Sequence, residues 1–243
     1  MPALSELILR GIKSIKFLIK RSLLYLATKE LTNRGPYFGQ TMEDELMEKY
    51  LPESYGTFLD IGAGRPKTHS NSFKFYSRGW RGVCVDPLPQ NRKLHKFFRN
   101  KDTFVEAIVG MRFESHKFYE FEPYGYSTSD PLHLQNALKK TGVKLVQVLQ
   151  LKSIKITSLP LARVRPHDPS FLTIDAEGFD LDILKSNDWS HFLPRLICIE
   201  SKGIIYGFEE VELEFQKFLS AIGYLLKSRT NLSLIYVHRD FFI

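Results

Sequence analysis

The chain is poor in the features that mark secreted, metal-binding or membrane-spanning proteins. Its 243 residues include only two cysteines, Cys84 and Cys198, and neither shows the spacing of metal ligands. Each lies in an apolar run typical of a strand, so we expect two buried free thiols. No run of about 18 apolar residues occurs, so no transmembrane helix is predicted. The first residues do not resemble a signal peptide, and we expect a cytoplasmic protein.

Positive charge is concentrated at the N-terminus. The net charge is +7, and residues 1–35 contain seven of the cations but only two acids. Apolar residues recur every three or four positions from Leu4 to Leu26, which predicts a basic amphipathic helix over residues 3–27. Such a helix suits contact with an anionic membrane surface, but it suits packing on the domain or on a partner subunit equally well. Residues 1–50, with a second capped helix at 41–50, are expected to precede a domain over residues 51–243.

The remainder of the chain alternates between strand-like and helix-like segments. This order predicts an α/β fold with a doubly wound, mostly parallel sheet, ending in an antiparallel hairpin. Residues 123–143 have no clear period and are expected to form a long irregular loop near the substrate. The expected strands cover residues 57–61, 81–86, 103–109, 116–122, 145–156, 170–175, 195–200, 223–228 and 232–238. The expected helices cover residues 70–79, 89–99, 158–163, 179–186 and 209–222.

A first group of candidate site residues follows the strand at 57–61. Asp60, Gly62 and Gly64 form a glycine turn that lets a ligand approach the backbone. Asp86 ends the next strand, at the distance where an acid binds a ribose diol in this architecture. The dinucleotide pattern requires a third glycine, which is missing here. The turn therefore suits an adenosyl ligand without a pyrophosphate better than NAD.

A second group follows the strand at 170–175. Asp175 and Glu177 bracket the strand end, where acids can bind a cationic ligand group, act as a base, hold a metal, or cap the following helix. Glu200 ends the next apolar run, so the three acids form a cluster only if their strands are neighbours. His69 and His133 are further candidates, because imidazole exchanges protons near pH 7.

These residues resemble the FkbM-like family of S-adenosylmethionine-dependent methyltransferases over about residues 56 to 228. The most specific stretch is Ile174-Asp175-Ala176-Glu177-Gly178-Phe179-Asp180-Leu181-Asp182-Ile183-Leu184-Lys185. Supporting stretches are Ser70-Asn71-Ser72, the run from Arg78 through Gly79-Trp80-Arg81-Gly82 to Asp86, and the strand from Pro194 to Glu200. Many members carry Glu at the position of Asp86 and have a longer glycine turn. The first 50 residues lie outside the resemblance.

The resemblance implies a seven-stranded class I methyltransferase sheet, S-adenosyl-L-methionine as cofactor, and O-methylation, often of a sugar hydroxyl. A sugar hydroxyl is a weak nucleophile, so a base should help. Asp175 is the first candidate for that base and Glu177 the second, although Asp175 could instead bind the methionine ammonium. Cofactor contacts are expected from Asp60, Gly62, Gly64, Asp86 and Asp175. Acceptor contacts are expected from Tyr126, Ser127, His133 and Glu200, and no metal ligands are predicted.

Three other functions are consistent with parts of the sequence. A nicotinamide-dependent oxidoreductase would use a similar sheet, but the missing third glycine disfavours it. The pI near 9.3 is compatible with a nucleic-acid methyltransferase, yet the chain has no Asn-Pro-Pro-Tyr tetrapeptide for a flipped base. A non-catalytic scaffold would dock through residues 3–27. The expected partner is a small-molecule or glycan acceptor rather than nucleic acid, and homo-oligomerisation stays open.

Overall fold

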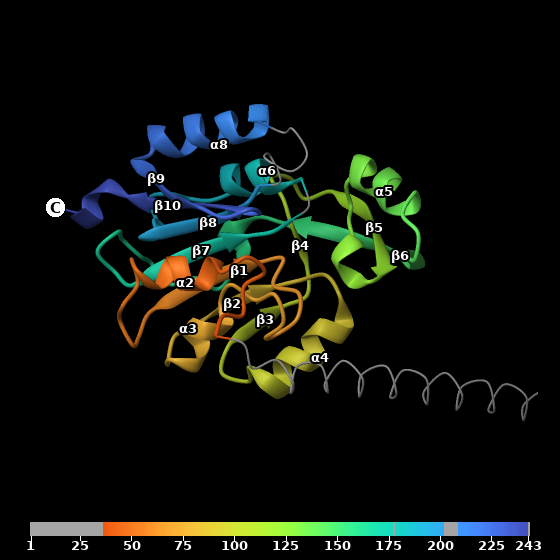
Figure 1. The fold of residues 1–243 in the computed structure, drawn as a ribbon, viewed down its shortest axis with the longest axis horizontal. Helices are drawn as coiled ribbons and strands as arrows, with labels where there is room; N and C mark the ends of the chain where they lie inside the picture. The colour runs from red at the N-terminus through yellow and green to blue at the C-terminus, as the bar shows by residue number, and fades with distance from the viewer. Residues whose placement is uncertain (1–35, 177, 202–208, 243) are drawn as a thin grey trace, which may run out of the picture.

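The computed structural model of this chain describes residues 36–176, 178–201 and 209–242 (Figure 1). The predicted helix at residues 3–27 and the candidate acid Glu177 therefore lie outside the described residues. A seven-stranded sheet forms the centre of the molecule, with strand order β3-β2-β1-β7-β8-β10-β9. The predicted α/β class, the seven strands and the antiparallel C-terminal hairpin are confirmed.

Six strands of this main sheet run in the same direction, and β10 alone runs antiparallel, between β8 and β9. β1 pairs in parallel with both β2 and β7, and β10 pairs antiparallel to β8 and β9. The C-terminal ends of the parallel strands thus meet at one edge of the sheet. The strands are β1 (Thr57–Ile61), β2 (Arg81–Val85), β3 (Thr103–Val105), β7 (Ser170–Ile174), β8 (Leu196–Glu200), β9 (Tyr224–Arg229) and β10 (Ser233–His238).

Helices cover both faces of the main sheet. α3 (Phe73–Ser77) and α4 (Pro89–Phe98) lie on one face, and α6 (Asp180–Lys185) and α8 (Glu209–Ala221) lie on the other (Figure 1). Because side chains alternate along a strand, β1 places Leu59 and Ile61 in one apolar core and Phe58 in the other. Cys84 and Cys198 are both buried and unbridged, as expected, and burial raises the pKa of each thiol.

A second, smaller sheet projects from the carboxyl edge of the main sheet. We call residues 108–154 the arm. It contains β4 (Ile108–Val109), β5 (Ser115–Glu122) and β6 (Lys144–Ile154), in the order β4-β6-β5. The expected irregular loop at 123–143 is wrong in part, since it contains the 3-10 turn η1 (Tyr124–Tyr126) and helix α5 (Pro131–Leu138). Asp130 accepts a hydrogen bond from the backbone N–H of His133 at 2.8 Å, and Pro131 opens the helix, which is a start signal visible in the sequence.

Three further expectations need correction. The single strand expected at 103–109 is two strands in different sheets, β3 and β4, because Val105 pairs with Val85 whereas Ile108 pairs with Ser153. The helix expected at 158–163 is replaced by the 3-10 turn η2 (Ile156–Ser158). Leu159 is extended before Pro160, as a proline requires of its predecessor. Helix α2 (Glu43–Glu48) forms within 41–50, but Met42 precedes it in a left-handed conformation with no side-chain cap.

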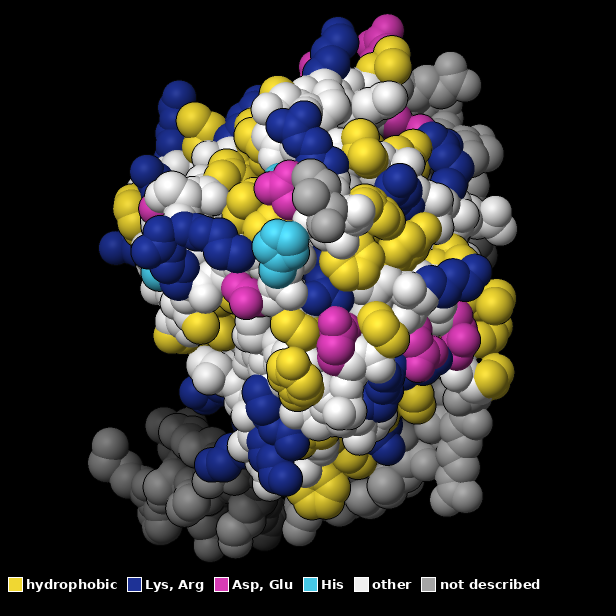
Figure 2. Space-filling view, turned by 90° about the vertical axis from the view of Figure 1, so that its left-hand side faces the viewer, with side chains coloured by type: hydrophobic (Ala, Val, Ile, Leu, Met, Phe, Trp, Pro, Cys, Tyr) yellow, Lys and Arg dark blue, Asp and Glu magenta, His cyan; other side chains and the backbone are white. Residues whose placement is uncertain are grey.

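The remaining features are the C-terminal turn and the surface of the molecule. The last described residues form the 3-10 turn η3 (Arg239–Phe242). The surface at the end of the molecule facing away from the arm carries basic and acidic side chains interspersed with apolar ones (Figure 2). Across the ranges that the structure describes, no helix is both long and apolar enough to cross a membrane.

Candidate functional site

A cavity of about 770 Å³ lies where the carboxyl ends of β1, β2 and β7 meet the arm. This volume includes the open solvent at the mouth of the cavity. Much of its wall is apolar and comes from four segments: the turn after β2, the link into the arm, β5, and the start of α6. The apolar wall residues are Leu88, Ala107, Ile108, Val109, Phe118, Phe179 and Ile183.

The glycine turn after β1 forms one side of this cavity. Gly62 has φ +77°, and a Cβ placed there would lie 1.8 Å from the backbone oxygen of Asp175. Only glycine therefore allows β1 and β7 to approach this closely at their ends. Gly64 also has a positive φ, and the ring of Tyr124 covers it, with the Arg65 guanidinium 4.7 Å from the centre of that ring. The end of β7 thus packs against one side of the glycine turn, and Tyr124 of the arm packs against the other.

Asp86 lies in the wall of the cavity, as its spacing predicts. Its carboxylate accepts hydrogen bonds from the N–H groups of Gly64 at 3.1 Å and Leu88 at 2.9 Å, and from the Asn91 amide at 2.8 Å. Burial raises the pKa of Asp86 to about 6, although these three donors oppose the rise. A carboxylate can accept about four hydrogen bonds, so Asp86 can still accept one from a hydroxyl of a bound ligand.

Asp60 does not line the cavity. Its carboxylate points into the opposite core, where it accepts a hydrogen bond from the Ser72 hydroxyl. Burial raises the pKa of Asp60, and the nearby Arg99 guanidinium partly offsets that rise. Asp60 therefore lies on the α3 side of the main sheet, next to Ser72. The predicted contact between Asp60 and the cofactor stays a prediction, and Asp60 is not among the residues that line the cavity.

Asp175 belongs to two cavities at once. It lines the cavity described above, which we call the large cavity. It also lines a smaller cleft of about 260 Å³ on the side of α2 and α3, which we call the polar cleft. The other walls of this polar cleft include Gln40, His69, Asn71 and Glu200. The Asn71 amide donates a hydrogen bond to the Thr173 hydroxyl at 3.2 Å. The strands of Asp175 and Glu200 are neighbours, so the structure brings these two predicted acids to one cleft.

The far wall of the polar cleft is fixed by a buried carboxylate. Glu43 is 1% exposed and accepts hydrogen bonds from the backbone N–H of Thr41, from the hydroxyl of Thr230 and from the hydroxyl of Ser233. These bonds join the start of α2 to the β9–β10 turn. The cleft is thus built from the N-terminal segment, the ends of β7 and β8, and the last hairpin.

The arm contributes some of the predicted acceptor residues to the large cavity. Tyr124, Ser127 and Ser129 line it, whereas Tyr126 and His133 do not. The imidazole Nδ1 of His133 lies 3.0 Å from a carboxylate oxygen of Asp130, and its ring packs against Gly178, the glycine of the Asp-x-Glu-Gly stretch.

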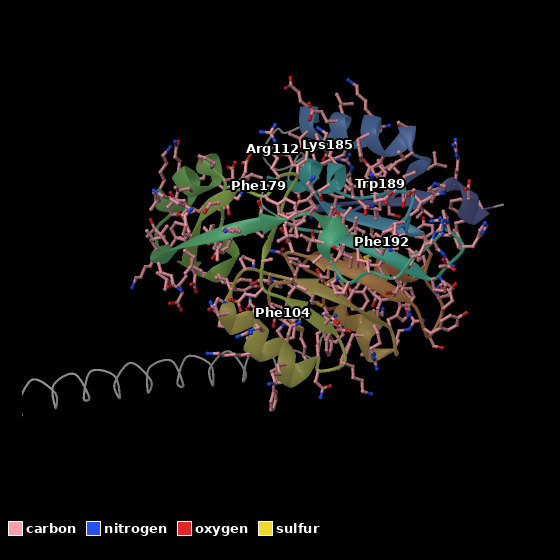
Figure 3. The ribbon with its side chains drawn as sticks, turned by 180° about the vertical axis from the view of Figure 1, so that it is seen from behind. Phe104, Arg112, Phe179, Lys185, Trp189 and Phe192 are labelled. Carbon is pink, nitrogen blue, oxygen red and sulfur yellow. The ribbon has the colours of Figure 1, made fainter. Side chains whose placement is uncertain are left out.

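A third cavity lies on the far side of Phe179. Figure 3 shows Phe179 and Arg112 close together where the arm joins the main sheet, and both line this cavity. It also contains His116 and Asp182, and it shares Ile108, Val109, Ser129 and Phe179 with the large cavity. We call it the arm cavity.

Sequence reasoning missed parts of the site. Gln40 lies in a segment with no recognisable motif, and no pattern marked it. Phe179 and Leu88 each stand two residues after an acid at a strand end, so their positions were a usable signal. Within the part of the chain that the structure describes, no group of three or more His, Cys, Asp or Glu side chains could hold a metal ion.

The residues of the large cavity fit an adenosyl ligand that carries a charged tail. The apolar wall from Ala107 to Val109 suits a purine ring, and Asp86 suits a ribose diol. Asp175 at the other end suits a cationic group.

Comparison with known proteins adds a family match. A family model described as "Methyltransferase FkbM domain" matches residues 60–226, which is more than half of the chain. No curated protein matches the chain. Among solved structures, a precorrin-6y C5,15-methyltransferase from Geobacter metallireducens is similar at 15% identity and a TM-score of 0.40, covering 84% of this chain and 91% of that one. A putative S-adenosyl-L-methionine-dependent methyltransferase from Methanococcus maripaludis is similar at 11% identity and a TM-score of 0.46, covering 90% and 92%.

Proposed function

Because the chain belongs to the FkbM methyltransferase family, we propose that it methylates a hydroxyl oxygen of a sugar or glycan-type acceptor. The family makes it an S-adenosylmethionine-dependent methyltransferase, and this membership replaces the oxidoreductase alternative. When bound, S-adenosylmethionine supplies an electrophilic methyl group on a positively charged sulfur.

The observation that carries the proposal is the meeting of two chemically different cavities at Asp175. The large cavity combines apolar walls with Asp86. The polar cleft presents the amides of Gln40 and Asn71 and the carboxylate of Glu200. Amides and carboxylates are the groups that hydrogen-bond a polyol, which has many hydroxyls and little apolar surface. A sugar in the polar cleft would therefore be adjacent to the cofactor cavity.

Each wall residue has a task in this proposal. Asp86 accepts hydrogen bonds from the ribose hydroxyls, and the glycine turn lets the backbone approach the ligand. On the cofactor side, the carboxylate of Asp175 would bind the positively charged ammonium of the methionine part of the cofactor. The arm closes the adenosyl side through Tyr124, which restricts access of water.

The first experiment is isothermal titration of the full chain with S-adenosylhomocysteine, with NAD as a parallel control. We expect micromolar binding of S-adenosylhomocysteine and no binding of NAD. The matched variant is Asp175→Asn, which should weaken S-adenosylhomocysteine about tenfold or more because a charged hydrogen bond is lost. Binding of NAD alone would contradict the cofactor assignment.

The second experiment identifies the acceptor class. The chain and S-adenosylmethionine are incubated with methyl glycosides of common hexoses and deoxyhexoses, and methyl ethers are detected by mass spectrometry. Transfer RNA and duplex DNA serve as acceptors for the nucleic-acid alternative. Methyl ethers on a glycoside would support the proposal. Methylation confined to nucleic acid would overturn it.

A further inference from the structure

We propose that the polar cleft is the acceptor site and that His69 takes the proton from the hydroxyl that is methylated. This inference rests on the proposed function, because it assumes a hydroxyl acceptor. It differs from the sequence-based expectation, which placed the base at Asp175 or Glu177 and most acceptor contacts on the arm.

The position of the cleft relative to the cofactor cavity is the first argument. With the ribose at Asp86 and the purine on the apolar wall near Val109, the charged tail of the cofactor faces Asp175. The polar cleft opens on the other side of that same residue. The arm cavity, in contrast, shares Ile108, Val109 and Phe179 with the purine end. An acceptor must reach the sulfur end, which favours the polar cleft.

The construction of the cleft is the second argument. Its far wall is held rigid by Glu43 and its donors, and Asn71 is tied to Thr173 by the hydrogen bond described above. Inside this wall the cleft has room for little more than one water molecule, so a polyol would lie across its open mouth, against these fixed polar groups. The backbone at His69 has φ +58°, an uncommon conformation for a residue with a side chain, and it places the imidazole in the wall.

The chemistry of the lining groups is the third argument. The ionisable side chains of the cleft come from four segments and are Glu43, His69, Asp175 and Glu200. An ordinary carboxylate has a pKa near 4 and is a weak base, whereas an ordinary imidazole has a pKa of about 6.5. His69 is also exposed to solvent, so it can pass the proton on to water. It is therefore the lining group best matched to this task near neutral pH.

The step balances without another reactant. The acceptor oxygen forms a bond to the methyl carbon with its lone pair, while the carbon–sulfur bond breaks and leaves its electron pair on sulfur. The hydroxyl proton moves to the imidazole of His69. The products are a methyl ether, a neutral thioether and an imidazolium that later loses its proton to solvent.

The test compares His69→Asn with the matched variant His116→Asn in the arm cavity. Asparagine tolerates a positive φ but cannot take the proton. We expect both variants to bind S-adenosylhomocysteine within about twofold of the unaltered chain. We expect kcat for the best methyl glycoside to fall about 100-fold or more in His69→Asn, and to stay within about twofold in His116→Asn. The fall in kcat toward acid pH should also disappear in His69→Asn when it is measured at saturating S-adenosylmethionine, where the titration of Asp86 does not limit cofactor binding.

Three results would overturn the inference. One is a loss of S-adenosylhomocysteine affinity of about tenfold or more in His69→Asn, which would place His69 in the cofactor site. Another is unchanged turnover in His69→Asn. The third is a loss of turnover in His116→Asn alone, which would place the acceptor in the arm cavity.

A second measurement separates this inference from the proposed function. In ring-labelled histidine spectra, the two variants identify the resonances of His69 and His116. Glycerol, a simple polyol, is titrated into the complex with S-adenosylhomocysteine. A shift of the His69 resonance with a constant His116 resonance supports the cleft even if no glycoside is methylated. No shift at His69 overturns the cleft as a polyol site.

Discussion

Asp86 lies in the wall of the large cavity with a buried carboxylate whose pKa is raised to about 6. Ribose hydroxyls donate hydrogen bonds to the ionised form, so cofactor binding should favour the deprotonated carboxylate. Since the pKa of the free protein is raised, the ionised fraction is nearly complete at pH 7.5 and falls through pH 6. We expect S-adenosylhomocysteine to bind about tenfold more weakly at pH 5 than at pH 7.5.

The control for this pH dependence is Asp86→Asn. This variant should bind S-adenosylhomocysteine weakly at both pH values, with little difference between them in calorimetric titrations. A native chain whose affinity is the same at pH 5 and pH 7.5 would contradict the role of Asp86. A variant that keeps the full pH dependence would assign it to another group.

Single residues also show what the sequence determines about this site. Asp86 was predicted from its spacing and lies in the cavity wall, because it follows the end of β2 at the sheet edge where the cavity lies. Asp60 was predicted from the same turn but faces the opposite core. The side chains of a strand alternate, so one-residue differences decide the face. On that face Asp60 lies near the guanidinium of Arg99, which is distant in sequence, so no local pattern predicts this interaction.

At the scale of elements, the C-terminal end of α4 is tied to the main sheet by a buried charge network. The guanidinium of Arg99 donates to Asp102 at 2.9 Å and to the Ser72 hydroxyl at 2.8 Å, and Ser72 in turn donates to Asp60. The side chains of Arg99 and Asp102 are 0% and 1% exposed. Removing Arg99 would leave two buried carboxyls without their cation. We expect Arg99→Met to lower the free energy of unfolding by about 3 kcal/mol or more.

The control lies on the same helix. Arg92 pairs with Glu106 at 3.1 Å, but the two side chains are 60% and 34% exposed. Arg92→Met should cost less than about 1 kcal/mol, because solvent already screens this pair. Urea unfolding of both variants measures the difference. The loss in Arg99→Met should shrink as the pH is lowered, since burial raises the pKa of both carboxyls and protonation removes their unpaired charge. Equal effects of the two variants would refute a structural network at Arg99.

Elements were predictable where one local signal dominated. The central strands β1, β2 and β7 were found because their apolar runs end in glycine or acid. The split between β3 and β4 was not found, because residues 103–109 are mostly apolar and contain no Gly or Pro, and only pairing with distant Val85 and Ser153 separates the two strands. The absence of a helix at 158–163 was available in principle from Pro160, and the start of α5 from Asp130 and Pro131.

At the scale of the whole molecule, the candidate site is assembled from parts that are distant in sequence. The large cavity needs the arm, and the polar cleft needs Gln40 from the N-terminal segment and the β9–β10 turn. The family resemblance implied the seven-stranded sheet with its antiparallel end, and the alternation of elements predicted that most strands are parallel. The contacts that close the cavities did not follow from either, because they depend on how the arm and the hairpin pack across the sheet edge.

This assembly predicts which regions should respond together to the cofactor. Hydrogen exchange at short labelling times reports local openings of the backbone. We expect S-adenosylhomocysteine to slow exchange at the main-sheet edge, in residues 62–64 and 86–88, and at the same time in the arm, in residues 124–129. Residues 209–229 of α8 and β9 contribute no wall to the large cavity and should exchange as before.

NAD at the same concentration is the control and should change none of these rates. Protection of the main-sheet edge without the arm would mean that Tyr124 and Ser127 do not close over the ligand, and the arm would then be assigned to another partner. Protection of the arm together with the sheet edge would show that a single ligand bridges both sheets. In that case the arm is the lid of the cofactor cavity, and the polar cleft at Asp175 remains the open route for the acceptor.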